Sequence, residues 1–254
     1  MNLCIDQGNS RTKVALFETD NSLVKSFIYK TFSSADVKRL FTLYPIEDSI
    51  VSSVVNIEPS VVNALNRHSR HFVLLDHHTP IPIVNDYESP HTLGQDRLAA
   101  AVGAAALFPK KDVLIIDAGS AITYDVLSHE GHYLGGNIAP GIRVRLQSLH
   151  RLSKKLPLVD VDENAMLPLL GKNTNDAIAA GVVRGVAFEV KGYIRALRAE
   201  QDTVADLQVV LTGGHAPFIL NHVKDDLHHE KNLVLIGLNV ILTHNMQIEK
   251  NDAL

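Results

Sequence analysis

One short pattern occurs twice in the chain and constrains its fold more than any other feature. Ile5-Asp6-Gln7-Gly8, followed by Thr12, is matched in the second half by Ile116-Asp117-Ala118-Gly119, followed by Thr123. In both places an apolar run leads into Asp-x-Gly and a second apolar run follows, which is typical of a β-hairpin with a tight turn. The repeat therefore predicts two related halves, each opening with the same hairpin.

Short β-rich runs alternate with helical stretches along the chain, which indicates an α/β architecture. We predict strands at 3–5, 13–17, 50–55, 72–75, 113–116, 122–127, 207–211 and 233–236, and helices at 60–67, 96–108, 142–151, 175–200 and 238–246. Lys110-Lys111-Asp112 precedes a new apolar strand at Val113. We therefore expect a first domain over 1–112 and a second over 113–254.

Composition and charge argue against several partners. With 24 Lys+Arg and 28 Asp+Glu, the formal net charge is -4, so we expect neither nucleic-acid nor membrane binding. The longest uncharged apolar run, 98–108, is too short to span a bilayer. The single cysteine, Cys4, cannot form an internal disulfide, which favours a reducing compartment, and we expect a cytoplasmic protein. The histidine clusters lack a zinc-binding spacing and are interpreted as surface residues.

The two hairpins also suggest a chemistry. Glycine lets backbone N–H groups approach a phosphate, and the aspartate can hold a hydrated cation beside it, so two facing hairpins would clamp a nucleotide. In the first copy Lys13 can neutralise phosphate charge, although it also fits a solvated edge strand. In the second copy Ser120 and Thr123 offer hydroxyls, and the later Thr212-Gly213-Gly214 leaves room for a base or ribose.

Asp96 stands where the alanine-rich helix is predicted to begin, and two interpretations of it remain open. It can be an N-cap, worth about 1 kcal/mol. Alternatively, the helix dipole keeps Asp96 ionised so that it accepts the proton of a substrate hydroxyl during phosphoryl transfer. Arg97 beside it offers a planar fork to a carboxylate or phosphoryl group, or forms a surface ion pair.

These motifs together resemble the type III pantothenate kinases, a family of the sugar kinase, heat-shock ATPase and actin superfamily. The resemblance covers nearly the whole chain and rests on the order of its motifs: Asp6-x-Gly8-Asn9-Ser10-x-x-Lys13, Ser52-Ser53-Val54-Val55, Tyr87-x-x-Pro90-x-x-Leu93-Gly94-x-Asp96-Arg97, Asp117-x-Gly119-Ser120-Ala121-x-Thr123, Gly135-Gly136-x-Ile138-x-Pro140-Gly141, Asn173-Thr174 and Thr212-Gly213-Gly214. Ser120 departs from the family, which usually has threonine there, but it keeps the hydroxyl.

The resemblance implies a fold and an activity. The fold is two ribonuclease H-like domains of the actin-like ATPase type. The activity is phosphorylation of the primary hydroxyl of pantothenate with ATP and Mg²⁺, which opens coenzyme A biosynthesis. A monovalent cation, K⁺ or NH4⁺, activates the reaction, and the enzyme is a homodimer.

The resemblance also implies roles for individual residues. Asp96 is the catalytic base, Asp117 is the ligand of the monovalent cation, and Asp6 is expected to be a ligand of the magnesium ion. The substrate-binding residues are Tyr87, Gly94, Gln95, Asp96, Arg97 and, from the neighbouring subunit, Thr174. The ATP-binding residues are Asp6, Gln7, Gly8, Asn9, Ser10, Arg11, Thr12, Lys13 and Ser120.

Three questions stay open at this point. The small residues Ala177, Ala180, Gly181 and Gly185 fit close helix packing, either in the core or in a dimer. The clamp alone does not name the substrate, so a kinase for another small alcohol is an alternative. A nucleotide-binding regulator with little turnover is the other alternative.

Overall fold

The computed structural model describes residues 1–200 and 206–252, and these form two compact units. The first unit comprises Met1–Pro109, Gly131–Tyr133 and Asn232–Leu254, and the second comprises Lys110–Glu130 and Leu134–Lys231. The change of unit at residue 110 lies close to the boundary expected from the sequence. The C-terminal segment differs from that expectation, because it packs with the first unit.

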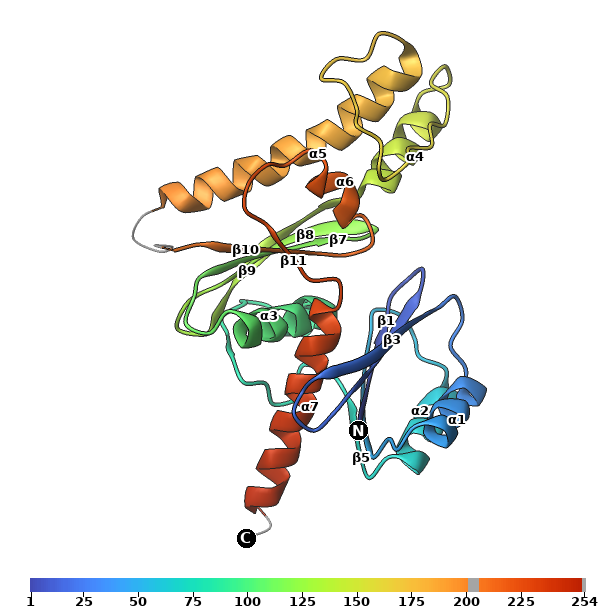
Figure 1. Cartoon of the computed structure of the whole chain (residues 1–254), viewed down its shortest axis with the longest axis vertical. Helices are drawn as coiled ribbons and strands as arrows, with labels where there is room; N and C mark the ends of the chain where they lie inside the picture. The colour runs from blue at the N-terminus through green and yellow to red at the C-terminus, as the bar shows by residue number, and fades with distance from the viewer. Residues whose placement is uncertain (201–205, 253–254) are drawn as a thin grey trace. The chain divides into compact units, whose positions relative to one another are not determined.

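The first unit is built on a five-stranded sheet of order β3-β2-β1-β4-β5. Its strands are β1 (Asn2–Gln7), β2 (Thr12–Phe17), β3 (Leu23–Tyr29), β4 (Asp48–Ser53) and β5 (His71–Leu74). β1, β2 and β3 pair antiparallel, whereas β4 and β5 continue the sheet in parallel from β1. Helices α1 (Ser34–Leu43) and α2 (Pro59–His68) lie side by side (Figure 1), and both contribute to one core with this sheet.

The strand β3 and the helix α1 of the first unit were not predicted from the sequence. Strand β3 is mostly exposed, so its sequence carries no buried alternation. Helix α1 begins with a capping box, in which Ser33 accepts from the Asp36 backbone N–H and Asp36 accepts from the Ser33 backbone N–H. A serine followed three residues later by an acidic residue is a helix-start signal, and it was present in the sequence.

Helix α7 (Leu233–Asp252) packs against α3 (Gln95–Leu107) and the first sheet. A strand at 233–236 was predicted, and that prediction is wrong because these residues form the first turn of α7. A short apolar run does not distinguish a strand from a buried helix by periodicity. A chain of amides attaches α7: the buried Asn2 donates to the buried Asn239 at 2.8 Å, and Asn239 donates to the exposed Asn21 at 2.7 Å.

The contact between α3 and α7 depends on two glycines, and we expect Gly237→Ala to destabilise the protein severely. A Cβ at Gly237 would lie 1.7 Å from the Ala99 carbonyl oxygen, and one at Gly103 would lie 2.4 Å from that of Leu233. Since both obstacles are helix backbone, the helices must separate, at an expected cost of more than about 3 kcal/mol in unfolding free energy. Urea unfolding measures this.

Gly192→Ala is the matched control for that prediction. Gly192 also lies inside a helix, α5 (Thr174–Ala199), but nothing lies within 4 Å of an added Cβ. Alanine should therefore stabilise the helix by about 0.5–1 kcal/mol. Equal unfolding free energies for the two variants would contradict the close approach of α3 and α7.

The second unit is built on a sheet with the strand order β11-β10-β7-β8-β9. Its strands are β7 (Val113–Ala118), β8 (Ala121–Leu127), β9 (His132–Pro140), β10 (Gln208–Thr212) and β11 (His228–His229). The short strand β6 (Val84–Asn85) pairs with the first two residues of β9, and these four residues belong to the first unit. β9 was not predicted, because Gly135 and Gly136 interrupt its apolar pattern.

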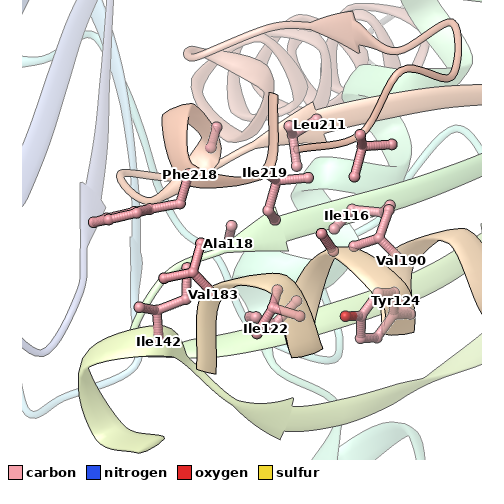
Figure 2. Packing of buried hydrophobic residues seen from close by; sticks show 14 of the residues in the cluster. Ile116, Ala118, Ile122, Tyr124, Ile142, Val183, Val190, Leu211, Phe218 and Ile219 are labelled. Atoms are coloured by element: carbon pink, nitrogen blue, oxygen red, sulfur yellow. The ribbon is translucent and has the colours of Figure 1, made fainter. Parts of the chain in front are cut away.

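The core of the second unit joins its sheet to α4 (Ile142–Leu152), α5 and the short α6 (Ala216–Leu220). Figure 2 shows Ile116 and Tyr124 from the sheet packed with Ile142, Val183 and Phe218 from these helices. The α/β architecture expected from the sequence is confirmed. Across the described residues 1–200 and 206–252, no helix is long and apolar enough to cross a membrane.

Candidate functional site

The repeated motif forms two matching hairpins, one in each unit. β1 and β2 pair antiparallel, and the Gly8 N–H donates to the Arg11 carbonyl at 3.1 Å to close the turn. β7 and β8 pair in the same way, with the Gly119 N–H donating to the Ala121 carbonyl at 2.9 Å. The hairpins predicted from the sequence are therefore confirmed, and the repeat is a structural one.

The end of the first hairpin gathers three polar side chains. Asp6 lies opposite Lys13 on β2 and in register with Ser52 on the parallel strand β4. Paired residues in neighbouring strands project to the same face of a sheet, so the carboxylate, the ammonium group and the hydroxyl share one face. The Ser52 hydroxyl is buried and has no hydrogen-bond partner within the described residues. Asn9, Ser10 and Arg11 in the turn are exposed.

The second hairpin repeats this arrangement in the second unit. Asp117 is in register with Thr212 on the parallel strand β10, and the Thr212 hydroxyl is buried without a hydrogen-bond partner in the described part of the chain. Gly213 follows with a φ of 92°, and a Cβ there would lie 2.4 Å from Asp117 Oδ1. A carboxylate beside a buried hydroxyl oxygen is a donor set that suits a hard cation.

The Ser120 end of the second turn is supported by the start of α4. The Gly141 N–H donates to the Ser120 carbonyl at 2.9 Å, and a Cβ at Gly141 would lie 2.4 Å from the Gly119 carbonyl oxygen. Arg145 holds the preceding residue, since its Nε donates to the Pro140 carbonyl at 2.6 Å. The turn that carries Ser120 is therefore fixed by a close backbone approach that only glycine allows.

Arg145 also belongs to a partly buried network of polar side chains. Glu189 on α5 accepts from Arg145 Nη2 at 2.8 Å and from the Tyr124 hydroxyl at 2.8 Å. Burial and the Glu189 carboxylate raise the pKa of Tyr124 well above its ordinary value, so the phenol stays protonated and donates. Tyr193 stacks on Tyr124 with ring centroids 4.1 Å apart.

In the first unit, the residues before and inside the first turn of α3 form a further cluster of polar side chains. The helix begins at Gln95 with Gly94 as its N-cap, so Asp96 is not the cap residue that one interpretation of the sequence assumed. Asp96 Oδ1 accepts from the Arg97 N–H at 2.9 Å. A Cβ at Gly94 would lie 2.5 Å from Asp96 Oδ1. The carboxylate therefore lies over the helix N-terminus, where the dipole favours negative charge.

Arg97 is buried, with only 6% of its surface exposed. Its guanidinium carbon lies 5.7 Å from the centroid of the Tyr87 ring, within the range of a cation–π contact. Tyr87 in turn lies 6.1 Å from Tyr133. The Gln95 amide donates to the Leu93 carbonyl at 3.2 Å, and its buried oxygen has no hydrogen-bond partner among the described residues. The structure thus brings together Tyr87, Gly94, Gln95, Asp96 and Arg97.

Comparison with known proteins identifies the family. The model of the type III pantothenate kinases matches residues 2–196. The chain belongs to this family. A type III pantothenate kinase of Bacteroides fragilis is 41% identical over 246 residues, which covers 96% of this chain and 98% of that protein. The family resemblance expected from the sequence motifs is confirmed.

Solved structures confirm the fold expected for a type III pantothenate kinase. A Baf family transcriptional activator from Campylobacter jejuni has a TM-score of 0.61 at 23% identity, covering 96% of this chain and 99% of that one. The activator of the 2-hydroxyisocaproyl-CoA dehydratase from Clostridium difficile, with bound ADPNP, has a TM-score of 0.56 at 12% identity, covering 98% and 97%. These likenesses support the two-domain actin-like fold.

One expected residue of the type III pantothenate kinase site, Thr174, lies in a cavity wall of the second unit. Thr174 is the first residue of α5, after the N-cap Asn173. It lines a cavity of about 480 Å³ between α4 and α5, whose other lining residues are Leu149, Leu156, Ala177, Ile178, Gly181 and Val182. The wall is almost wholly apolar, so Thr174 provides its polar group.

Proposed function

We propose that the chain transfers the γ-phosphoryl group of ATP to the primary hydroxyl of pantothenate, giving 4'-phosphopantothenate, the first step of coenzyme A biosynthesis. Membership of the type III pantothenate kinase family over nearly the whole chain is the observation that carries this proposal. The polar group around Asp96 supplies the chemistry that such a reaction needs. The buried Cys4, whose thiol pKa is raised by burial, fits a reducing compartment such as the cytoplasm.

Asp96 is the proposed catalytic base. Its carboxylate lies in the first turn of α3 and is favoured in its ionised form by the helix dipole. Phosphoryl transfer proceeds through a loose transition state, so the base accepts the hydroxyl proton as the new P–O bond forms. Catalysis then depends mainly on positioning. Tyr87, Gly94, Gln95 and Arg97 are the proposed substrate-binding residues, and the burial of Arg97 against Tyr87 fixes its planar fork.

ATP, together with Mg²⁺, is the proposed ligand of the two hairpins. When bound, Mg²⁺ would neutralise the phosphates and polarise the transferred group. In the first unit, Asp6 would offer its carboxylate to the Mg²⁺, and Lys13 lies opposite Asp6 on β2. The buried Ser52 hydroxyl, in register with Asp6, has no hydrogen-bond partner within the described residues. The turn residues Gln7, Gly8, Asn9, Ser10, Arg11 and Thr12 offer backbone and side-chain donors to phosphate, and Ser120 does so in the second unit.

A monovalent cation, K⁺ or NH4⁺, is proposed at Asp117. The residues fit such an ion, because the carboxylate is in register with the buried Thr212 hydroxyl, which no protein group satisfies within the described residues. An oxygen-rich site next to the nucleotide turn adds positive charge without a further lysine or arginine. Asp117 and Thr212 would hold the ion through their side-chain oxygens.

We also propose that the chain forms a homodimer through the α4 and α5 side of its second unit. Large apolar side chains are exposed there: Leu152, Leu158, Met166, Leu169, Leu170 and Phe188. Gly181 and Gly185 face open space, so they do not serve packing inside the unit. Such a surface is typical of a protein interface, and it includes the cavity that Thr174 lines.

Sedimentation tests the dimer. The wild type should sediment as a dimer at micromolar concentration, and Leu170→Glu should shift it to monomer, because a charge would be buried in an apolar interface. Leu43→Glu is the control, since Leu43 is also an exposed apolar residue but lies in the first unit. A wild type that stays monomeric would remove Thr174 from a shared pocket.

Measuring ADP release with pantothenate and with a panel of other small alcohols distinguishes this proposal from two alternatives. A kinase for another small alcohol would release ADP with that alcohol and not with pantothenate. A nucleotide-binding regulator would bind ATP but release no ADP with any alcohol. The proposal expects ADP release that depends on pantothenate, with Mg²⁺ and K⁺ present.

A further inference from the structure

A histidine outside the sequence motifs connects the two glycine turns of the second unit by hydrogen bonds. His215 directly follows Thr212-Gly213-Gly214, and its backbone N–H donates to the Ala118 carbonyl at 2.8 Å. Its ring Nδ1 lies 2.9 Å from the Gly119 carbonyl oxygen. One residue therefore makes a main-chain and a side-chain hydrogen bond to the turn between Asp117 and Ser120.

The partner of the ring determines its tautomer. A carbonyl oxygen only accepts hydrogen bonds, so Nδ1 carries the hydrogen and donates it to Gly119. The ring of Phe218 packs edge-on against the imidazole, with centroids 5.9 Å apart and planes at 73°. Partial burial lowers the pKa of His215 below its ordinary value, so the ring is neutral at neutral pH and Nε2 is an acceptor.

The ring of His215 adds a side-chain contact to a turn that backbone groups hold from both sides. The Gly119 N–H bonds to Ala121 inside the turn, and Gly141 holds the Ser120 carbonyl from the α4 side. On the β10 side, Gly213 comes so close that a Cβ would lie 2.5 Å from the Ala118 carbonyl oxygen. The bond from His215 is the side-chain contact that fixes the orientation of the peptide between Gly119 and Ser120.

We propose that His215 is a positioning residue of the nucleotide site, whose Nδ1–H holds the Gly119 carbonyl and thereby aims the Ser120 hydroxyl and the turn's N–H groups at the phosphates. The inference rests on the proposed function, since it assumes that this turn binds ATP. His215 acts through Gly119, so its effect should fall on nucleotide affinity. Binding of pantothenate, proposed at the residues around Asp96 and at Thr174, should not depend on it.

The test compares His215→Ala with His215→Asn. Alanine removes the donor, whereas the Nδ2–H of asparagine takes nearly the place of the histidine Nδ1–H. Calorimetry with a non-hydrolysable ATP analogue and Mg²⁺ measures the dissociation constant, and steady-state kinetics gives the KM values for ATP and pantothenate. Alanine should weaken nucleotide binding and raise the KM for ATP by about five- to tenfold, the loss expected from one hydrogen bond. The KM for pantothenate should stay within about twofold.

His222→Ala is the matched control. His222 is buried, and its Nδ1 also bonds to a backbone carbonyl at 2.9 Å, but that carbonyl belongs to Phe218 and not to the turn. This variant should lower Tm and leave the dissociation constant of the analogue unchanged. His215→Asn should restore affinity to within about twofold of the wild type, an effect that general loss of stability would not produce.

The possible outcomes distinguish the positioning role of His215 from the proposed kinase function. If the wild type binds the analogue and phosphorylates pantothenate while His215→Ala binds as tightly, the positioning role is wrong and the function stands. If asparagine fails to restore affinity, the Nδ1–H bond is not the cause. If the wild type binds the analogue but does not phosphorylate pantothenate, the function fails and the dissociation constants still decide the role of His215. If the wild type binds no nucleotide, both are wrong.

Discussion

Replacing Asp96 by asparagine should lower kcat for pantothenate phosphorylation by about 100- to 10,000-fold, the range for loss of a general base. The amide keeps the size of the carboxylate and its ability to accept from the Arg97 N–H, but it does not take up a proton at neutral pH. The dissociation constant for ATP should therefore stay close to that of the wild type. Initial rates and calorimetry on the same preparation measure both quantities.

Asp36→Asn controls for the loss of an acid from a helix start. Asp36 also lies in the first turn of a helix of the first unit, where it completes the capping box with Ser33. Its replacement should cost about 1 kcal/mol of unfolding free energy and leave kcat unchanged. If Asp96→Asn behaved like Asp36→Asn, with full kcat and a lower Tm, Asp96 would be a structural residue of the helix start.

Replacing Asp117 by asparagine should abolish activation by K⁺ and raise the KM for ATP by at least about tenfold, since loss of even an outer-sphere partner costs a metal site 10- to 100-fold. The variant keeps an oxygen beside Thr212 but removes the charge that balances the cation. Rates in K⁺ and in Na⁺ buffers, each as a function of ATP concentration, give both effects.

Asp112→Asn is the control for Asp117. It changes a buried aspartate just before the same strand, at the opposite end from the turn, where Asp112 accepts from the His129 N–H at 2.8 Å. Asparagine still accepts that bond, so activity and its dependence on K⁺ should persist. An Asp117→Asn enzyme with normal, K⁺-dependent rates would show that the cation is held elsewhere.

The hairpins were predictable from sequence because their signals are local. Asp-x-Gly between two apolar runs specifies a turn over a few residues, and both copies have the predicted pairing. The cluster around Asp96 could also be predicted from the sequence, because Gly94 to Arg97 are consecutive and Tyr87 lies a few residues earlier. Chain neighbours stay neighbours in any fold.

Other features depend on tertiary contacts that no local pattern reports. The strand predicted at 233–236 is the start of α7, whose packing depends on Gly237 meeting the backbone of α3. That packing also takes the C-terminal segment into the first unit, against a division at a single point in the sequence. His215 becomes relevant only because β10 pairs with β7 and brings it to Gly119.

Direct detection of the product tests the central claim most directly. The wild-type chain, given ATP, Mg²⁺, K⁺ and pantothenate, should form 4'-phosphopantothenate in amounts equal to the ADP released, as measured by mass spectrometry. Replacement of K⁺ by Na⁺ should lower that rate. ATP binding without phosphopantothenate in either buffer would contradict the account and favour a regulator or a kinase for another alcohol.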